Sequence, residues 1–175
     1  GDIVRTIDVG ITAFARISRA DVIPISIKPG AVIVGLSSSG QTLYETEYNS
    51  GIGSNGLTAA RHDVLTKKYL TQFPESCAPE TPDEVKYTGK YNLLDAYVCN
   101  GVQHEVGKLL LSPTRTYLPF LVKLIAEHRK NLQGIIHCTG GAQTKVKKFI
   151  KGMRVIKDNL FDPPPVFQMI AECSL

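Results

Sequence analysis

Short apolar runs alternate along this chain with segments in which apolar residues recur at helical spacing. Four runs are predicted strands because they are rich in β-branched or apolar residues or follow turn signals: Val4–Ile17, Gly30–Ser37, Leu132–Cys138 and Met153–Asp158. Four segments are predicted helices: Asn55–Phe73, Ser112–Asn131, Gln143–Gly152 and Pro163–Cys173. This alternation favours an α/β or layered α+β fold in which helices pack on a mixed sheet.

The segment between Pro74 and Gly107 interrupts this pattern because it is polar and rich in Pro, Gly, Asp and Glu. In a compact domain such a composition predicts a surface excursion, of a length usually tied to function or mobility. A short element near Tyr91–Tyr97 is expected to interrupt the excursion.

Composition sets the broad class of the protein. The 175 residues, 43% of them hydrophobic, are enough for one domain with a core of its own. The net charge of +4 is small beside 20 basic and 16 acidic residues, so it indicates no particular partner. The four cysteines lack the spacing of a zinc site and the density of a disulfide scaffold, which favours reduced thiols.

No apolar run reaches the ~20 residues that span a bilayer, so a soluble cytoplasmic protein is expected. The chain opens without Met, almost directly in a strand-like run, which suggests a piece of a longer protein.

Glycine-rich turns stand ahead of two predicted helices, at Gly53–Gly56 and at His137–Ala142. A helix N-terminus presents unpaired backbone N–H groups and a partial positive charge, so a glycine turn there lets a phosphate approach the backbone. The simpler alternative is that each glycine only reverses the chain. Neither turn has the spacing of a Walker-type phosphate loop, which disfavours that class of ATPase.

Two side chains near these turns are candidates for chemistry. His137 ends a predicted strand, where ligands of open α/β sheets gather, or it is a satisfied core histidine. Arg115 either forks onto a phosphate or carboxylate, or pairs with a surface acid. No metal-spaced cluster and no Ser/His/Asp order stands out, and the other histidines receive no role. Nucleic-acid binding is not expected, because aromatic residues are not interleaved in the one basic helical face, which consists of Lys145, Lys147, Lys148 and Lys151.

Three motifs that follow one another along the chain indicate a protein family more specifically together than any one of them does alone. They lie in the stretches SSSG with SNGLTAAR, LLLSPTRTY, and IIHCTGGAQTKVKKFI. Over nearly the whole chain they resemble the C-terminal domain of the aminoimidazole ribonucleotide synthetase family, also called phosphoribosylformylglycinamidine cyclo-ligase. That family typically shows S-S-G-x-H-S-N-G-x-x-x-x-R, then P-T-R-x-Y, then H-x-T-G-G-G. The resemblance implies the fold of that C-terminal domain.

The resemblance also implies an ATP- and Mg²⁺-dependent enzyme of purine biosynthesis. Phosphoryl transfer activates the formyl amide oxygen of formylglycinamidine ribonucleotide, and an internal nitrogen then closes the imidazole ring. The family's N-terminal domain carries the main ATP- and metal-binding residues and the dimer core, and nothing in this chain resembles it. The chain is therefore expected to be a single domain, the C-terminal half of a homodimeric enzyme, inactive alone. Its expected partners are its own N-terminal domain and a phosphorylated purine intermediate.

By position in the motifs, the resemblance assigns a set of substrate- and phosphate-binding residues: Ser54, Asn55, Gly56, Arg61, Arg115, Thr139, Gly140 and Gly141. His137 matches the histidine of the third motif and is the candidate catalytic residue, and no metal ligand is assigned. Both glycine turns are then expected to face one cleft, where fixed dipoles act on a phosphate. Three departures from the family pattern are visible. Gly53 replaces the family's histidine, residues 41–52 form an insertion, and Ala142 replaces the third glycine.

Two alternatives of other kinds stay open. One is a non-catalytic module that binds a nucleotide or a phosphorylated ligand. The other is a domain of a related enzyme, such as formylglycinamide ribonucleotide amidotransferase or selenophosphate synthetase.

Overall fold

The structure is a computed structural model that describes residues 2, 9–54 and 56–174. It divides into two compact units, each assembled from separated segments of the chain. Unit 1 comprises Gly1–Gly10, Ser37–Arg115 and Phe161–Leu175, in their described parts, and unit 2 comprises Ile11–Leu36 and Thr116–Leu160. That the chain is the single C-terminal domain of a larger enzyme stays a prediction.

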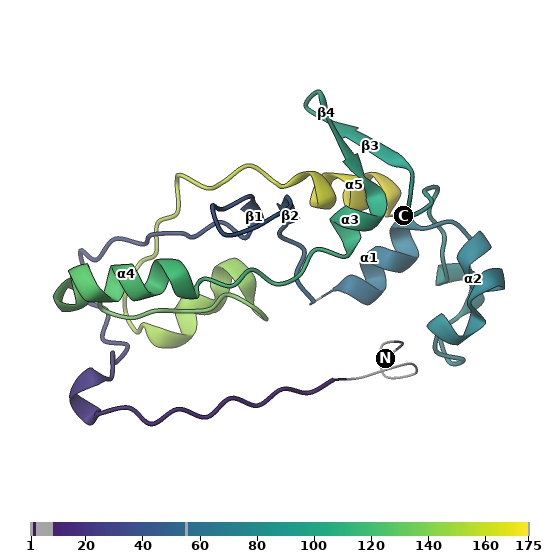
Figure 1. The fold of residues 1–175 in the computed structure, drawn as a ribbon. Coiled ribbons are helices and arrows are strands. Elements are labelled where there is room, and N and C mark those ends of the chain that lie inside the picture. The colour runs from purple at the N-terminus through teal and green to yellow at the C-terminus, as the bar shows by residue number, and fades with distance from the viewer. Residues whose placement is uncertain (1, 3–8, 55, 175) are drawn as a thin grey trace. The chain divides into compact units, whose positions relative to one another are not determined.

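Unit 1 is built on short helices and two small sheets (Figure 1). Its α-helices are α1 (Leu57–Val64), α2 (Lys68–Gln72), α3 (Val106–Leu110) and α5 (Pro165–Cys173), and its 3₁₀ helices are η3 (Pro74–Ser76) and η4 (Asp83–Val85). Each sheet is an antiparallel pair, β1 (Ser39–Gly40) with β2 (Asn49–Ser50), and β3 (Ala96–Cys99) with β4 (Val102–Glu105). Ser39 faces Ser50 in the first pair, and Cys99 faces Val102 in the second.

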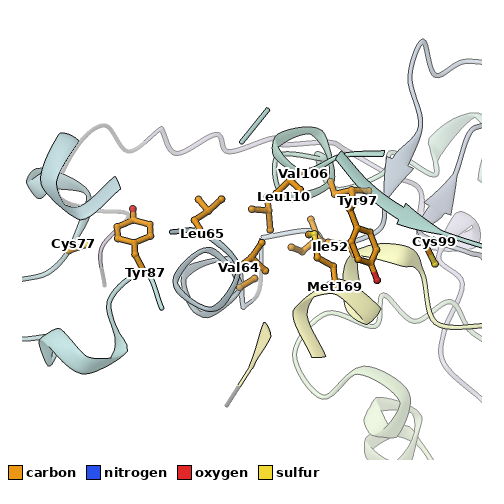
Figure 2. Packing of buried hydrophobic residues seen from close by; sticks show 13 residues of the cluster. Ile52, Val64, Leu65, Cys77, Tyr87, Tyr97, Cys99, Val106, Leu110 and Met169 are labelled. Carbon is orange, nitrogen blue, oxygen red and sulfur yellow. The ribbon is translucent and has the colours of Figure 1, made fainter. Parts of the chain in front are cut away.

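The core of unit 1 is formed by α1, α3 and α5. Figure 2 shows Val64 and Met169 beside Ile52 in this cluster. The apolar residues Met169 and Ile170 follow Val166 by three and four positions, so all three bring one face of α5 onto the core. Full burial of such a side chain contributes roughly 1.5–3 kcal/mol to folding. The most buried apolar side chains, at most 1% exposed, are Val64, Val106, Leu109, Val166 and Met169.

The segment that carries Gly89 closes the C-terminal end of α1. The Gly89 N–H donates to the Leu65 carbonyl at 3.1 Å, and the Tyr91 N–H donates to the Val64 carbonyl at 3.1 Å. A Cβ on Gly89 would lie 2.2 Å from the carbonyl carbon and oxygen of Val64. Glycine is therefore required where this segment crosses the end of the helix.

Unit 2 has less regular structure and no buried residue among those described. It contains α4 (Leu118–His128) and the 3₁₀ helices η2 (Arg19–Asp21), η5 (Arg129–Asn131) and η6 (Ala142–Phe149). Its large apolar side chains are often mostly exposed, as at Ile11, Phe14, Val32 and Val34. No helix in the described part of the chain is long and apolar enough to cross a membrane.

Two of the helix predictions are confirmed in position. The predicted helix Pro163–Cys173 is α5, which begins at Pro165. The predicted basic helix Gln143–Gly152 is the 3₁₀ helix η6, which ends at Phe149. Both were visible in the sequence because a local pattern of apolar and polar residues defines them.

The other two helix predictions are wrong in extent. The predicted helix Asn55–Phe73 is two helices in its described part, residues 56–73, because Leu65 leaves helical geometry and bridges to Tyr91. In the segment Ser112–Asn131, the helix α4 starts only at Leu118. Residues 112–115 instead make hydrogen bonds to the β1–β2 region, which competes with helix formation.

The strand predictions are wrong throughout the part of the chain that the structure describes. Residues 9–17, Gly30–Ser37, Leu132–Cys138 and Met153–Asp158 contain no strand, and residues 4–8 of the first prediction lie outside the described residues. A strand exists only where a neighbour accepts and donates its ladder hydrogen bonds. The run Leu132–Cys138 accepts one backbone hydrogen bond, from the Ser26 N–H to the Gln133 carbonyl at 2.8 Å, and no ladder continues from it among the described residues.

The hairpin β3–β4, in contrast, lies inside the segment predicted as a surface excursion. Helices with small antiparallel sheets place the chain in the mixed α and β class, compatible with α+β. The predicted mixed sheet is not found among the described residues, where both sheets are antiparallel pairs.

Candidate functional site

The predicted site residues are divided between the two units. Unit 1 holds Ser54, Gly56, Arg61 and Arg115, and unit 2 holds His137, Thr139, Gly140 and Gly141. Asn55 lies outside the described residues. Whether the two glycine turns face one cleft therefore stays a prediction.

The Gly51–Gly56 turn of unit 1, which is described except for Asn55, has an unusual backbone at its glycines. Gly51, Gly53 and Gly56 have φ angles of 79°, 61° and 81°, a region that residues with a Cβ rarely adopt. Gly56 is the N-cap of α1, and glycine has no side chain with which to cap a helix. First-turn N–H groups at such a helix end suit an anion, because they point outward and carry the positive end of the helix dipole.

A frame of hydrogen bonds holds the strand that leads into this turn. The Ser50 N–H donates to Ser112 Oγ at 3.0 Å, and Asn49 Nδ2 donates to the Pro113 carbonyl at 2.9 Å. Ser50 is fully buried, and its hydroxyl donates to the Leu109 carbonyl at 2.6 Å. The turn is therefore anchored to the stretch that carries the P-T-R motif.

Arg115, the arginine of that motif, is buried and binds the serine-rich loop Ser37–Gly40. Its Nη1 donates to the Ser37 carbonyl at 2.8 Å and to the Ser39 carbonyl at 2.9 Å, and its Nη2 donates to the Gly40 carbonyl at 2.8 Å. The Glu45 carboxylate accepts two further hydrogen bonds, from Arg115 Nε to Oε1 and from Nη2 to Oε2, each at 2.8 Å; this pair is called the fork below. A guanidinium has five N–H donors, so these five hydrogen bonds use all of them.

Glu45 is ionised in this arrangement. The hydrogen bonds from Arg115 hold the pKa of the Glu45 carboxyl below its ordinary value, against a smaller opposing effect of burial. The side chains of Arg115 and Glu45 are 5% and 16% exposed, so water screens the pair weakly. Of the two alternatives for Arg115, the structure contains the pairing with an acid.

Arg61 is also paired, in a cluster that sequence reasoning missed. Its Nη2 donates to Asp2 Oδ2 at 2.9 Å and to the Ser76 carbonyl at 2.8 Å. His62 Nε2 lies 2.7 Å from the same Asp2 oxygen, and the Tyr87 N–H donates to His62 Nδ1 at 3.2 Å. Because Nδ1 accepts, the proton of the neutral ring is assigned to Nε2, which donates to Asp2.

Asp2 is nearly inaccessible, with a side chain 2% exposed. Burial, the largest single cause, raises the pKa of its carboxyl, but the hydrogen bonds from the Ala78 N–H and from His62, together with electrostatic attraction to His62 and Arg61, bring the pKa below its ordinary value. No local pattern announces this cluster, since Asp2 and His62 are 60 positions apart in the sequence. Its contacts tie Asp2 to α1 within unit 1, which is a structural role.

Arg61 further lines a cavity of about 280 Å³ in unit 1. The other lining residues are mainly apolar, among them Leu57, Leu65 and Leu110. The Arg61 Nε is buried and has no hydrogen-bond partner among the residues that the structure describes. A cavity with so few polar groups offers little to a phosphate, whose binding needs several donors.

The second glycine turn, Thr139–Gly141, lies on the surface of unit 2. Gly141 has a φ angle of 87° and is the N-cap of η6, and Lys145 Nζ lies 3.5 Å from Thr139 Oγ1. His137 is exposed, and its ring makes an edge contact with Tyr117 at a centroid distance of 6.5 Å. This exposure excludes the alternative in which His137 is a core histidine.

Metal-binding groups do not cluster in the part of the chain that the structure describes. No set of three or more His, Cys, Asp or Glu side chains there is placed to hold a metal ion. Cys77, Cys99, Cys138 and Cys173 are free thiols.

Curated proteins named phosphoribosylformylglycinamidine cyclo-ligase are similar to this chain, whereas no family model matches it. The protein of that name from Methanopyrus kandleri is 29% identical over 168 residues, which are 96% of this chain and 37% of the relative. The one from Methanocaldococcus jannaschii is 29% identical over 170 residues, 97% of this chain and 39% of the relative. The one from Methanothermobacter thermautotrophicus is 28% identical over 174 residues, 99% of this chain and 41% of the relative.

The chain thus spans about two-fifths of the length of these relatives. The resemblance that the ordered motifs predict is confirmed: along nearly its whole length, this chain is similar to phosphoribosylformylglycinamidine cyclo-ligases.

Proposed function

We propose that this chain is the substrate- and phosphate-binding C-terminal domain of an ATP-dependent cyclo-ligase. The enzyme would close the imidazole ring of formylglycinamidine ribonucleotide to give aminoimidazole ribonucleotide in purine biosynthesis. The observation that carries the proposal is similarity to cyclo-ligases over 96% of the chain or more in the three relatives above. The proposal is also supported by hydrogen bonds from the P-T-R stretch to the S-S-G stretch and to the strand that leads into the Gly51–Gly56 turn.

The proposal gives the two glycine turns related roles. Backbone N–H groups of Gly53, Ser54 and Gly56, with the Ser54 hydroxyl, bind the phosphate of the ribonucleotide. The neighbouring N–H groups of Gly51, Ile52 and Leu57 already donate within the protein. The Thr139–Gly141 turn offers N–H donors to the phosphoryl group that is transferred, where fixed dipoles stabilise developing charge. His137 is the proposed catalytic residue, because its exposed imidazole can exchange a proton with a bound substrate.

When ATP is bound, it supplies the phosphoryl group that activates the formyl amide oxygen. The described residues offer no carboxylate cluster for Mg²⁺, so they do not by themselves fit a magnesium–nucleotide site. We therefore assign the main ATP- and Mg²⁺-binding residues to the N-terminal domain of the full enzyme. The same proposal includes the layered fold of the family's C-terminal domain, a homodimeric assembly and a cytoplasmic location.

Calorimetry with three ligands tests the binding role. Formylglycinamidine ribonucleotide should bind this chain, and the corresponding riboside, which lacks the phosphate, should bind at least about tenfold more weakly because it loses charge-assisted hydrogen bonds. ATP without substrate should bind weakly. Tight ATP binding without substrate binding would instead support the non-catalytic nucleotide module, and equal affinity for ribonucleotide and riboside would contradict a phosphate site.

A further inference from the structure

The guanidinium of Arg115 is enclosed by acceptors from one short stretch of chain. Among the described residues, five hydrogen bonds from the guanidinium go to the carbonyls of Ser37, Ser39 and Gly40 and to both carboxylate oxygens of Glu45. An anion that displaced Glu45 would still leave three carbonyl oxygens on the guanidinium. These carbonyls would repel a phosphate that approached the same group, so direct phosphate binding by Arg115 is disfavoured.

The loop that Arg115 holds lies directly against the Gly51–Gly56 turn. Ser39 and Gly40 form β1, which pairs with Ser50 and Asn49 of β2 immediately before the turn. A Cβ on Gly51 would lie 2.7 Å from Ser38 Oγ and 3.1 Å from the Ser39 nitrogen. The start of the turn is therefore packed directly against the loop, and the Ser38 hydroxyl donates to the Gly51 carbonyl at 3.4 Å.

The same stretch of chain also braces the turn from its other side. Ser112, three residues before Arg115, accepts from the Ser50 N–H, and a Cβ on Gly53 would lie 3.6 Å from Thr114 Oγ1. Residues 112–115 thus contact the strand before the turn, the turn itself and the loop behind it. Displacement of Arg115 would loosen all three contacts together.

We propose that Arg115 is a positioning residue: through its fork on Glu45 and the carbonyls of Ser37–Gly40, it fixes the Gly51–Gly56 turn so that the turn's N–H groups bind a phosphate. This inference rests on the proposed phosphate site at that turn. It differs from the role that the motif resemblance implies, because Arg115 acts through the loop and does not touch the ligand.

Glu45→Gln tests the inference, because it weakens the fork while Arg115 and the turn remain. The probe is ribose 5-phosphate, titrated into the isotopically labelled chain while the amide resonances of Gly53, Ser54, Gly56 and Leu57 are followed. If Arg115 positions the turn, the variant binds roughly fivefold to tenfold more weakly, since loss of the charged fork loosens the turn. Glu47→Gln is the matched control, because Glu47 lies with Glu45 in the connection between β1 and β2 but its carboxylate forms an exposed pair with Lys108 at 3.1 Å.

The sign of the effect separates positioning from direct binding. A ligand role would make Glu45→Gln bind ribose 5-phosphate more tightly, since Gln has one acceptor oxygen where Glu has two and so frees one donor of Arg115, and that result would overturn the inference. An affinity equal to that of Glu47→Gln would overturn it as well. Arg115→Lys is the second variant, and it should weaken binding further because an ammonium has three donors for five acceptors.

The same titration separates this inference from the proposed function. If ribose 5-phosphate binds at the turn but formylglycinamidine ribonucleotide does not, the proposed substrate is wrong while the positioning role stands. If the wild-type chain shows no shift of the turn amides with either ligand, there is no phosphate site at the turn, and both proposals fail.

Discussion

A single methyl group on Gly89 would collide with the backbone of α1. Its Cβ would lie 2.2 Å from the Val64 carbonyl atoms and 2.4 Å from the Asp63 oxygen. Because backbone atoms cannot swing aside as a side chain does, Gly89→Ala should lower the free energy of unfolding by about 3 kcal/mol. Urea denaturation measures this. The control is Gly140→Ala, where no atom lies within 4 Å of the added carbon, and a loss as large there would contradict the steric argument.

Glu45 gives unit 1 a specific sensitivity to acid. Its pKa is held below the ordinary value near 4.5, chiefly by Arg115, so its contribution to stability is complete above that value and is lost as the pH falls through the lowered pKa. Glu45→Gln should remove about 2 kcal/mol at pH 7, from lost charged hydrogen bonds. The gap between wild type and variant should then narrow below about pH 4.5. Unfolding in urea at several pH values measures both, and a constant gap down to pH 3 would contradict the pairing.

Arg115 also shows how far the contacts of a single residue can be predicted from the sequence. The P-T-R motif makes the arginine a candidate, and pairing with an acid is one of its two sequence alternatives. Its partner Glu45 lies 70 positions away, so only the fold could identify it. The same holds for His62, to which the sequence gives no role and which is fixed by Asp2.

Among the elements, the hairpin β3–β4 depends on its two-residue turn. Asn100 and Gly101 both have positive φ angles, 50° and 77°, which is the backbone of the tight turns that match strand twist. Gly101→Ala should destabilise the hairpin by about 1 kcal/mol, because an alanine there adopts a left-handed conformation although its Cβ meets no atom within 4 Å. Thermal unfolding measures the change. The control is Asn100→Gly, which keeps a residue that tolerates positive φ. A loss of stability as large as that of Gly101→Ala would show that the left-handed turn conformation is not the cause of the destabilisation.

The contrast between elements follows from what a local sequence can encode. The helix α5 is predictable because its buried residues, Val166, Met169 and Ile170, recur at helical spacing within one stretch of the sequence. The Asn-Gly pair at the β3–β4 turn is an equally local signal, but the surrounding polar composition masked it. The predicted strands failed because a strand needs a partner, and periodicity of one segment does not say whether a partner exists.

At the scale of the whole molecule, the two units differ in how much they bury. The described residues of unit 2 include no buried side chain, whereas unit 1 encloses Val64, Leu109 and Met169. Short helices are marginal in water without a buried face, so the amides of α4 should exchange with deuterium within about tenfold of the unprotected rate. Those of α3 should be at least about a thousandfold slower. Mass spectrometry of exchanged peptides measures both, and slow exchange in α4 equal to that in α3 would show that unit 2 has a core of its own.

The proposed activity belongs to the full enzyme, since this chain spans about two-fifths of its cyclo-ligase relatives. Alone, with ATP and formylglycinamidine ribonucleotide, it should form no aminoimidazole ribonucleotide. Turnover should appear when a chain that supplies the remaining length of a close cyclo-ligase is added, because the main ATP-binding residues are proposed to lie there. A coupled assay for ADP release, with product identified by mass spectrometry, measures this.

In the reconstituted enzyme, His137→Ala should reduce turnover by roughly a hundredfold if the imidazole transfers a proton. The free energy of unfolding should change by less than about 0.5 kcal/mol, because the side chain is exposed. Lys148→Ala, an exposed residue of η6, is the control and should leave both quantities unchanged. Turnover by this chain alone would contradict the division of labour between the two domains. Normal turnover of His137→Ala would remove that histidine from the mechanism while leaving the binding role of the glycine turns to be judged by the titrations with phosphorylated ligands.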